Sequence, residues 1–102
     1  MLAKSAQLAA TDIAGTSQLA ALIRASGPTI KIRKRLYKVS KIAIEEGVNV
    51  AHLEVPFAAF KAVLRANGSV NGYPGAEVWT VLNDMSVVVT FAVHNGQLLT
   101  LI

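Results

Sequence analysis

TIKIRKRLYKVSK, residues 29–41, carries six positive charges in thirteen residues and no acid. Two secondary structures compete for this stretch. Residues 29–35 alternate apolar and charged positions, as a half-buried strand does. Over the longer range 29–46, the apolar residues are spaced four, three and four apart, which is typical of one face of a helix: Ile32, Leu36, Val39 and Ala43. With Gly47 as a C-cap, the pattern predicts a basic helix over residues 30–46.

Five positive side chains of this predicted helix gather on one broad face: Lys31, Lys34, Arg35, Lys38 and Lys41. Like charges three or four residues apart destabilise an isolated helix by about 0.2–0.5 kcal/mol per pair, so a partner that offsets the repulsion is expected. Nucleic-acid phosphates are such a partner, because their neutralisation releases counterions. A solvated face is the simpler alternative, but it usually carries both signs. The predicted contacts to DNA or RNA come from Lys31, Arg33, Lys34, Arg35, Lys38 and Lys41.

Charge placement over the whole chain supports a local basic surface. The net charge is only +4, with a pI near 9.8, yet seven of the ten Lys and Arg residues lie between Arg24 and Lys41. The first acid after Asp12 is Glu45. Such segregation creates a positive field even when the total charge is small.

Several kinds of chemistry are disfavoured by composition. The chain has no cysteine and two histidines, so disulfides and a four-ligand structural zinc site are not expected. The glycine-rich stretch 67–75 lacks the GK[ST] sequence of a phosphate loop. No cofactor and no metal are therefore predicted. The chain also has neither a signal-peptide pattern nor 18 consecutive apolar residues, which predicts a cytoplasmic protein without membrane contact.

On the N-terminal side of the basic stretch, the sequence predicts two further helices. An Ala-rich helix is expected over residues 2–12. A second helix, QLAALIRA, begins after Thr16 or Ser17 and ends at Ser26-Gly27-Pro28, because Gly followed by Pro is a strong helix stop.

Residues 17–36, SQLAALIRASGPTIKIRKRL, resemble in outline the helix-turn-helix of bacterial repressors. The likeness lies in a first helix, the turn in ASGPTI and a basic second helix. It departs at Arg24, which holds a turn position usually given to glycine, and at Arg33, where the second helix buries an aliphatic residue. The resemblance implies that four side chains point toward the major groove: Thr29, Lys31, Arg33 and Lys34.

On the C-terminal side, the pattern changes from helix to strand. Residues 48–55 favour a short strand, Pro56 opens a predicted fourth helix, and residues 67–75 form a glycine-rich connector. The expected fold class is α+β, with N-terminal helices followed by a three-stranded antiparallel β-meander. The chain is predicted to be one domain, 1–102: residues 1–66 mainly helical, 67–75 the connector and 76–102 the meander.

The meander also predicts self-association. With two-residue turns at Asn83-Asp84 and Asn95-Gly96, Trp79 and Val81 fall on an outer face that is too apolar to remain in water. The last strand would lie at a sheet edge, reaching Ile102. A homo-oligomer formed through the apolar face or the edge strand is therefore expected.

Two alternatives to passive nucleic-acid binding remain open. His52 and His94, with nearby Lys or Arg, would supply the general base, general acid and cation of a small metal-independent ribonuclease or toxin domain. A non-enzymatic module whose basic face meets an acidic protein is the other. Because spacing does not bring the two histidines together, an enzyme is the less favoured interpretation.

Overall fold

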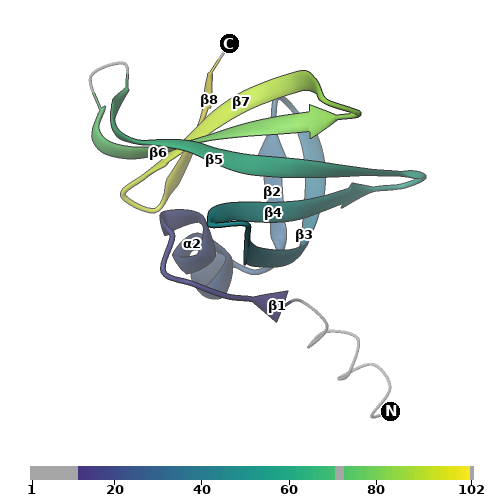
Figure 1. Ribbon diagram of the computed structural model, residues 1–102, viewed down its shortest axis with the longest axis horizontal. Coiled ribbons are helices and arrows are strands. Elements are labelled where there is room, and N and C mark those ends of the chain that lie inside the picture. The colour runs from purple at the N-terminus through teal and green to yellow at the C-terminus, as the bar shows by residue number, and fades with distance from the viewer. Residues whose placement is uncertain (1–11, 71–72, 102) are drawn as a thin grey trace.

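The computed structural model describes residues 12–70 and 73–101 and consists mainly of strands (Figure 1). It contains one described helix, α2 (Gln18–Ser26), which precedes most of the strands. The strands are β1 (Asp12–Ile13), β2 (Thr29–Ile32), β3 (Arg35–Glu45), β4 (Val48–Val55), β5 (Ala58–Val70), β6 (Tyr73–Asn83), β7 (Ser86–His94) and β8 (Gln97–Leu101).

All eight strands belong to one sheet. From β2 to β8, each strand pairs antiparallel with the next, and the short β1 pairs parallel with β3. The sheet rolls so that β2 approaches β8, and β2 and β3 cross behind β4 and β5 (Figure 1). Side chains from both flanks of the sheet, such as Ile32 and Phe91, share one core with Leu19 of α2.

The predicted basic helix over residues 30–46 is wrong, because this segment is the β2–β3 hairpin. In β2 the side chains alternate, with Ile30 and Ile32 buried and Lys31 exposed. The spacing that suggested a helix does not mark the core, since Leu36 is 60% exposed whereas its neighbour Tyr37 is buried. The short alternating pattern at 29–35 was the better guide, because β-branched and aromatic residues suit a half-buried strand.

The other predicted elements have mixed outcomes. The helix at QLAALIRA is confirmed, with the Ser17 side chain accepting a hydrogen bond from the Ala20 N–H and Gly27 at the C-cap. The helix after Pro56 is wrong, since Phe57 completes a turn into β5. Of the predicted connector 67–75, residues 67–70 belong to β5 and 73–75 to β6, and residues 2–11 of the first predicted helix lie outside the described part of the chain. The α+β fold class is therefore incorrect.

The predicted register of the β6–β7 hairpin is also wrong. The turn is Asp84-Met85, one residue later than expected, and Val81 pairs with Val89. Moving a two-residue turn by one residue keeps the same faces together, but a bulge between Val81 and Leu82 then changes the register, so that Trp79 pairs with Phe91. Trp79 and Val81 are accordingly fully buried in the core and do not form an outer apolar face. The Asn95-Gly96 hairpin is confirmed, while Ile102 lies outside the described residues.

The strand order places the turns at two opposite ends of the rolled sheet. The turns Glu46-Gly47 and Asn95-Gly96 lie at the end that holds α2, which we call the helix end. The turns Arg33-Lys34, Pro56-Phe57 and Asp84-Met85 lie at the opposite end, which we call the three-turn end. In Figure 1 the β4–β5 and β6–β7 turns project to the right, away from α2.

Candidate nucleic-acid interface

The β2–β3 hairpin displays three lysines on its outer surface. Lys31 and Lys38 face outward because they alternate with buried neighbours. A register shift between Val39 and Lys41 then adds one residue, so that Lys41 also faces outward despite its odd spacing from Lys38. These three lysines share a face, but the face belongs to a strand pair and not to the predicted helix.

The remaining cations of the hairpin lie at its tip. Arg33 and Lys34 form the turn and have φ values of 52° and 69°. Arg35 lies differently, because its guanidinium carbon is 5.6 Å from the centre of the Tyr37 ring and 5.3 Å from that of Phe60. A guanidinium at this distance interacts favourably with the ring faces. Arg35 therefore covers the aromatic edge of the core while adding positive charge to the tip.

Acids on neighbouring strands divide the predicted cations into two groups. Lys38 is paired across the sheet with Glu54, and Lys41 lies beside Asp12 of β1. No such acid is the cross-strand partner of Lys31, which faces Leu36. Over residues 12–70 and 73–101, the salt bridges within 4.0 Å are confined to Glu45, with His52 and Lys61. The least compensated charges are therefore Lys31 and the turn pair Arg33-Lys34.

The helix-turn-helix resemblance is not supported by the structure. Thr29 and Lys31 lie in β2, and Arg33 and Lys34 lie in a turn, so no second helix presents them. Arg24 has a structural role, because its Nη2 donates hydrogen bonds to the carbonyl oxygens of Ile13 at 3.4 Å and Gly15 at 2.9 Å.

His52 belongs to a small charged cluster on the outer face of β3, β4 and β5. Its Nε2 lies 2.9 Å from Glu45 Oε2, and Lys61 Nζ lies 3.6 Å from Glu45 Oε1. The hydrogen bond from His52, and secondarily the Lys61 charge, hold the pKa of Glu45 below its ordinary value, although burial opposes them. Lys41 and Lys61 are the cross-strand neighbours of His52, so this histidine does have cations beside it.

His94 lies elsewhere, next to the β7–β8 turn at the helix end. Its Nε2 is 3.0 Å from the carbonyl oxygen of Pro74, and its strand partner is Gln97. Each histidine is thus engaged by a different set of elements, and the structure does not assemble the His52–His94 pair that the ribonuclease alternative needs. Within the described residues, no group of three His, Cys, Asp or Glu side chains is arranged to hold a metal ion.

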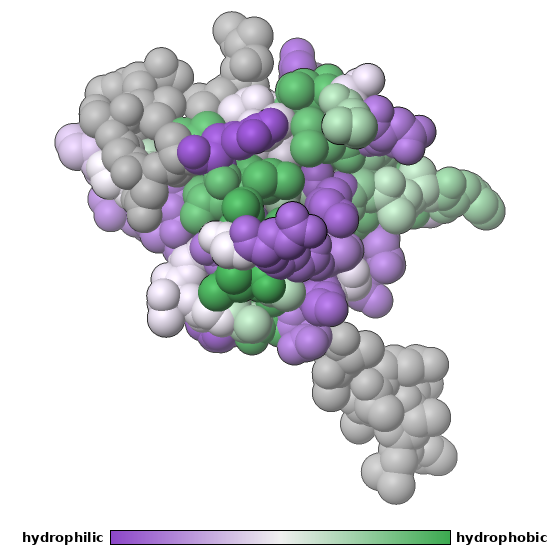
Figure 2. Space-filling view, viewed as in Figure 1, coloured by the Kyte–Doolittle hydropathy of each residue, from purple (hydrophilic) through white to green (hydrophobic). Residues whose placement is uncertain are grey.

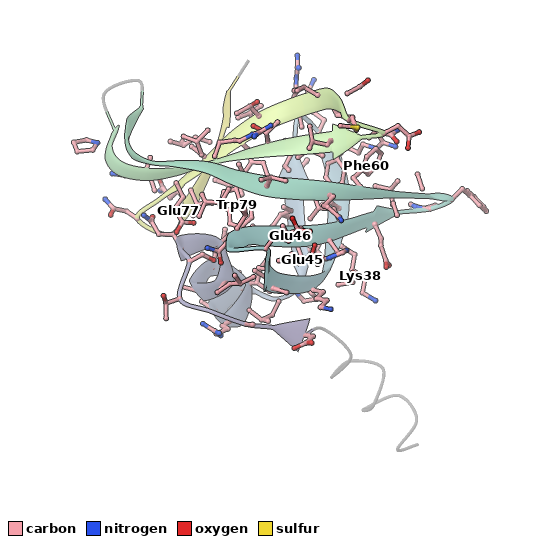
Figure 3. All side chains as sticks on the ribbon, in the orientation of Figure 1. Lys38, Glu45, Glu46, Phe60, Glu77 and Trp79 are labelled. Carbon is pink, nitrogen blue, oxygen red and sulfur yellow. The ribbon has the colours of Figure 1, made fainter. Side chains whose placement is uncertain are left out.

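Glu77 is a buried carboxylate that the sequence did not single out. It accepts hydrogen bonds from the backbone N–H groups of Gln18 at 2.6 Å and Leu19 at 3.2 Å, and from Trp79 Nε1 at 3.1 Å. Figure 3 shows Glu77 and Trp79 side by side next to α2. A carboxylate at a helix N-terminus is stabilised by the helix dipole. These donors explain Glu77 as a support for α2 and not as a catalytic acid.

A shallow groove of about 360 Å³ connects the basic hairpin to the β4–β5 turn. Its wall combines apolar and charged side chains: Thr29, Leu36, Tyr37, Lys38, Glu54, Val55 and Pro56. In Figure 2 hydrophobic colour continues along the β4–β5 arm at the right of the view, and hydrophilic colour lies beside it. The groove therefore places exposed apolar surface next to the cations.

Comparison with protein-family models, with curated proteins and with solved structures finds no match for this chain. No helix in the described part of the chain has the length and apolar character needed to cross a membrane.

Proposed function

We propose that this protein binds nucleic acid through the cations of the β2–β3 hairpin, chiefly Lys31, Arg33 and Lys34. The observation that carries the proposal is that these three cations are exposed on one hairpin whose own sequence, residues 29–41, contains no acid. Phosphate groups are attracted to such a surface without any need for base recognition. Lys38 extends the surface, although Glu54 opposite it reduces its contribution.

The proposal differs from the sequence-based hypothesis in the element that makes the contacts. A hairpin presents its cations from a turn and from alternate strand positions, so the row is shorter than the predicted helix face of five residues. Arg35 is held over two rings and contributes mainly through its charge. Binding should therefore depend on few phosphate contacts, and the affinity should fall only moderately with salt because the log–log slope scales with the number of contacts.

The test is binding of the purified protein to fluorescein-labelled oligonucleotides, measured by anisotropy across salt concentration. Single-stranded and duplex oligonucleotides of equal length are used, and the label is checked on a gel for cleavage. The Arg33→Gln/Lys34→Gln variant should lose affinity at low salt, and its log–log salt slope should fall by about 1.4 for single strands because two contacts are removed. Wild-type protein that binds neither oligonucleotide at low salt would refute the proposal.

A matched control separates the hairpin from net charge. Lys61→Gln/Arg65→Gln removes the same two charges from exposed positions on β5, outside the hairpin. If this control loses as much affinity as the tip variant, binding reflects overall charge and the proposed interface is wrong. Shortened label would instead favour the ribonuclease alternative and direct attention to the His52 cluster. Binding of an acidic protein but not of nucleic acid would favour the interaction module.

Two further expectations accompany this proposal as predictions. The first is self-association through the edge of β8, because the apolar sheet face that the sequence also suggested for self-association is buried in the core. The cytoplasmic location is the other.

A further inference from the structure

The two ends of the rolled sheet use different residues at the same turn position. At the helix end, the second turn residue is glycine in both described turns: Gly47, with a φ of 80°, and Gly96, with a φ of 76°. At the three-turn end, the corresponding residues are Lys34, Phe57 and Met85, with φ values of 69°, 68° and 70°. Glycine is favoured there because a Cβ crowds the left-handed backbone conformation.

The large side chains at the three-turn end gain nothing from packing within the described structure. Phe57 is 104% exposed and Met85 is 93% exposed. Both residues therefore combine a strained backbone with an apolar side chain in water. Strain of this kind is found where function requires a particular side chain at a turn. The combination indicates that the two tips contact something outside the fold.

The same end carries the cations of the proposed interface. Neighbouring strands lie about 4.8 Å apart, so successive turns on one side of a meander are about 10 Å apart along the sheet. The turn Arg33-Lys34 is thus the neighbour of the turn that bears Phe57. The groove lined by Leu36, Lys38 and Pro56 lies between the two hairpins that carry these turns.

We infer that the three-turn end binds single-stranded nucleic acid, with Phe57 and Met85 contacting base faces while Arg33 and Lys34 contact phosphates. This inference rests on the proposed function and narrows its ligand. A single strand offers an anionic backbone and exposed apolar bases together, whereas a duplex hides its base faces in the stack. Aromatic side chains bind bases of any sequence in this way, because every base has a π-face.

An anionic bilayer would also bind a surface that carries both cations and apolar tips, but Asp84 favours bases over a bilayer. Asp84 directly precedes Met85, so burying Met85 among lipids would bring a carboxylate to negative headgroups. The amino group of cytosine, in contrast, donates a hydrogen bond to a carboxylate. The apolar groups are also separate, one to a turn, which suits bases presented one at a time.

The test compares two glycine variants in the same anisotropy assay, with a cytosine-containing single strand and the matched duplex. Phe57→Gly/Met85→Gly keeps the turn conformation and every charge. It should lower single-strand affinity about tenfold or more, leave duplex affinity within about twofold and leave the salt slope unchanged. Ile44→Ala/Val48→Ala, which removes exposed apolar groups near the helix end, should change neither affinity.

The outcomes separate the inference from the proposed function. Salt-dependent binding that requires Arg33 and Lys34 but is indifferent to Phe57→Gly/Met85→Gly would overturn the inference and leave the proposed function standing. Failure to bind either oligonucleotide would overturn both. Co-sedimentation with vesicles containing phosphatidylglycerol that is lost in Phe57→Gly/Met85→Gly, with oligonucleotide binding unchanged, would also overturn the inference and assign the tips to a bilayer.

Discussion

The helix end and the three-turn end are built from the same kind of hairpin but differ in the residue at the second position of each turn. The helix end closes its described turns with Gly47 and Gly96 and covers the core with α2. The three-turn end closes its turns with Lys34, Phe57 and Met85. A non-glycine residue in the left-handed region costs about 1–2 kcal/mol, so the second arrangement is the less stable one locally.

The contrast indicates that the two ends serve different purposes. At the helix end, polar groups are satisfied internally, as when Glu77 accepts three hydrogen bonds from α2 and Trp79. At the three-turn end, charges and apolar groups are both left in water. Changes at the helix end should therefore lower stability, and changes at the three-turn end should alter binding with little loss of stability.

The largest expected effect is at the helix end. Glu77→Ala would leave two α2 N–H groups and Trp79 Nε1 without their acceptor, all in or next to the core. A buried donor that loses its acceptor costs about 1–3 kcal/mol, so the total loss of unfolding free energy should be about 3 kcal/mol or more. Urea denaturation followed by tryptophan fluorescence measures it.

Glu77→Gln is the matched control, because it keeps the shape and one acceptor oxygen. It should cost less than Glu77→Ala. Equal stability of wild type and Glu77→Ala would show that the contacts at Glu77 do not hold α2, and the comparison between the two ends would lose its main support.

The second prediction exchanges the turn residues of the two ends. Gly47→Ala should destabilise the fold by about 1 kcal/mol, because the φ of 80° is strained for alanine although no atom lies within 4 Å of the added Cβ. Met85→Gly should have the opposite sign and stabilise by about 0.5 kcal/mol, since relief of strain exceeds the entropy that glycine loses on folding. Thermal unfolding of both variants is the measurement, and a loss of stability in Met85→Gly would contradict this account.

The turns also show why sequence reasoning succeeded at one end and failed at the other. Asn95-Gly96 and the Ser17 cap were predicted because their residues suit their conformations. At the three-turn end, Arg33-Lys34 carries no turn-forming residue, Pro56 is equally typical of a helix start, and Asn83-Asp84 suggested the β6–β7 turn one residue too early. Because the sequence does not indicate a turn at Arg33-Lys34, its pattern predicted one continuous basic helix.

The candidate site was predicted in its residues but not in its shape. The density of positive charge at 29–41 is visible in the sequence, and the structure exposes those cations. Their separation into outward lysines, a turn pair and a ring-stacked Arg35 depends on strand register and on the bulge after Val39. Such long-range pairing leaves no local periodic signal, and neither does the exposure of Phe57.

A third prediction concerns Arg35, which belongs to the three-turn end but has internal partners. Arg35→Ala should reduce stability by about 0.5–1 kcal/mol through loss of its contact with the rings of Tyr37 and Phe60. Thermal unfolding is the measurement, and Lys34→Ala is the control because its side chain is exposed in the turn. Equal effects of the two substitutions would show that ring contact adds nothing to the tip.

The smallest expected effect lies between the two ends, at Glu45. The hydrogen bond from His52 is the main cause of its lowered pKa, and the Lys61 charge is a lesser one. Since the folded-state pKa is below the unfolded value, the stabilisation is present above the unfolded pKa and is lost as pH falls through the folded pKa. His52→Ala should therefore raise the Glu45 pKa toward its ordinary value, as followed by NMR titration of the side-chain carboxyl carbon. Lys61→Gln should raise it less.

An unchanged pKa in His52→Ala would mean that the 2.9 Å contact between His52 Nε2 and Glu45 Oε2 does not persist in solution. Because this cluster lies on the outer face between the ends, neither variant should alter the binding affinity of the Arg33-Lys34 tip by more than the loss of one nearby charge.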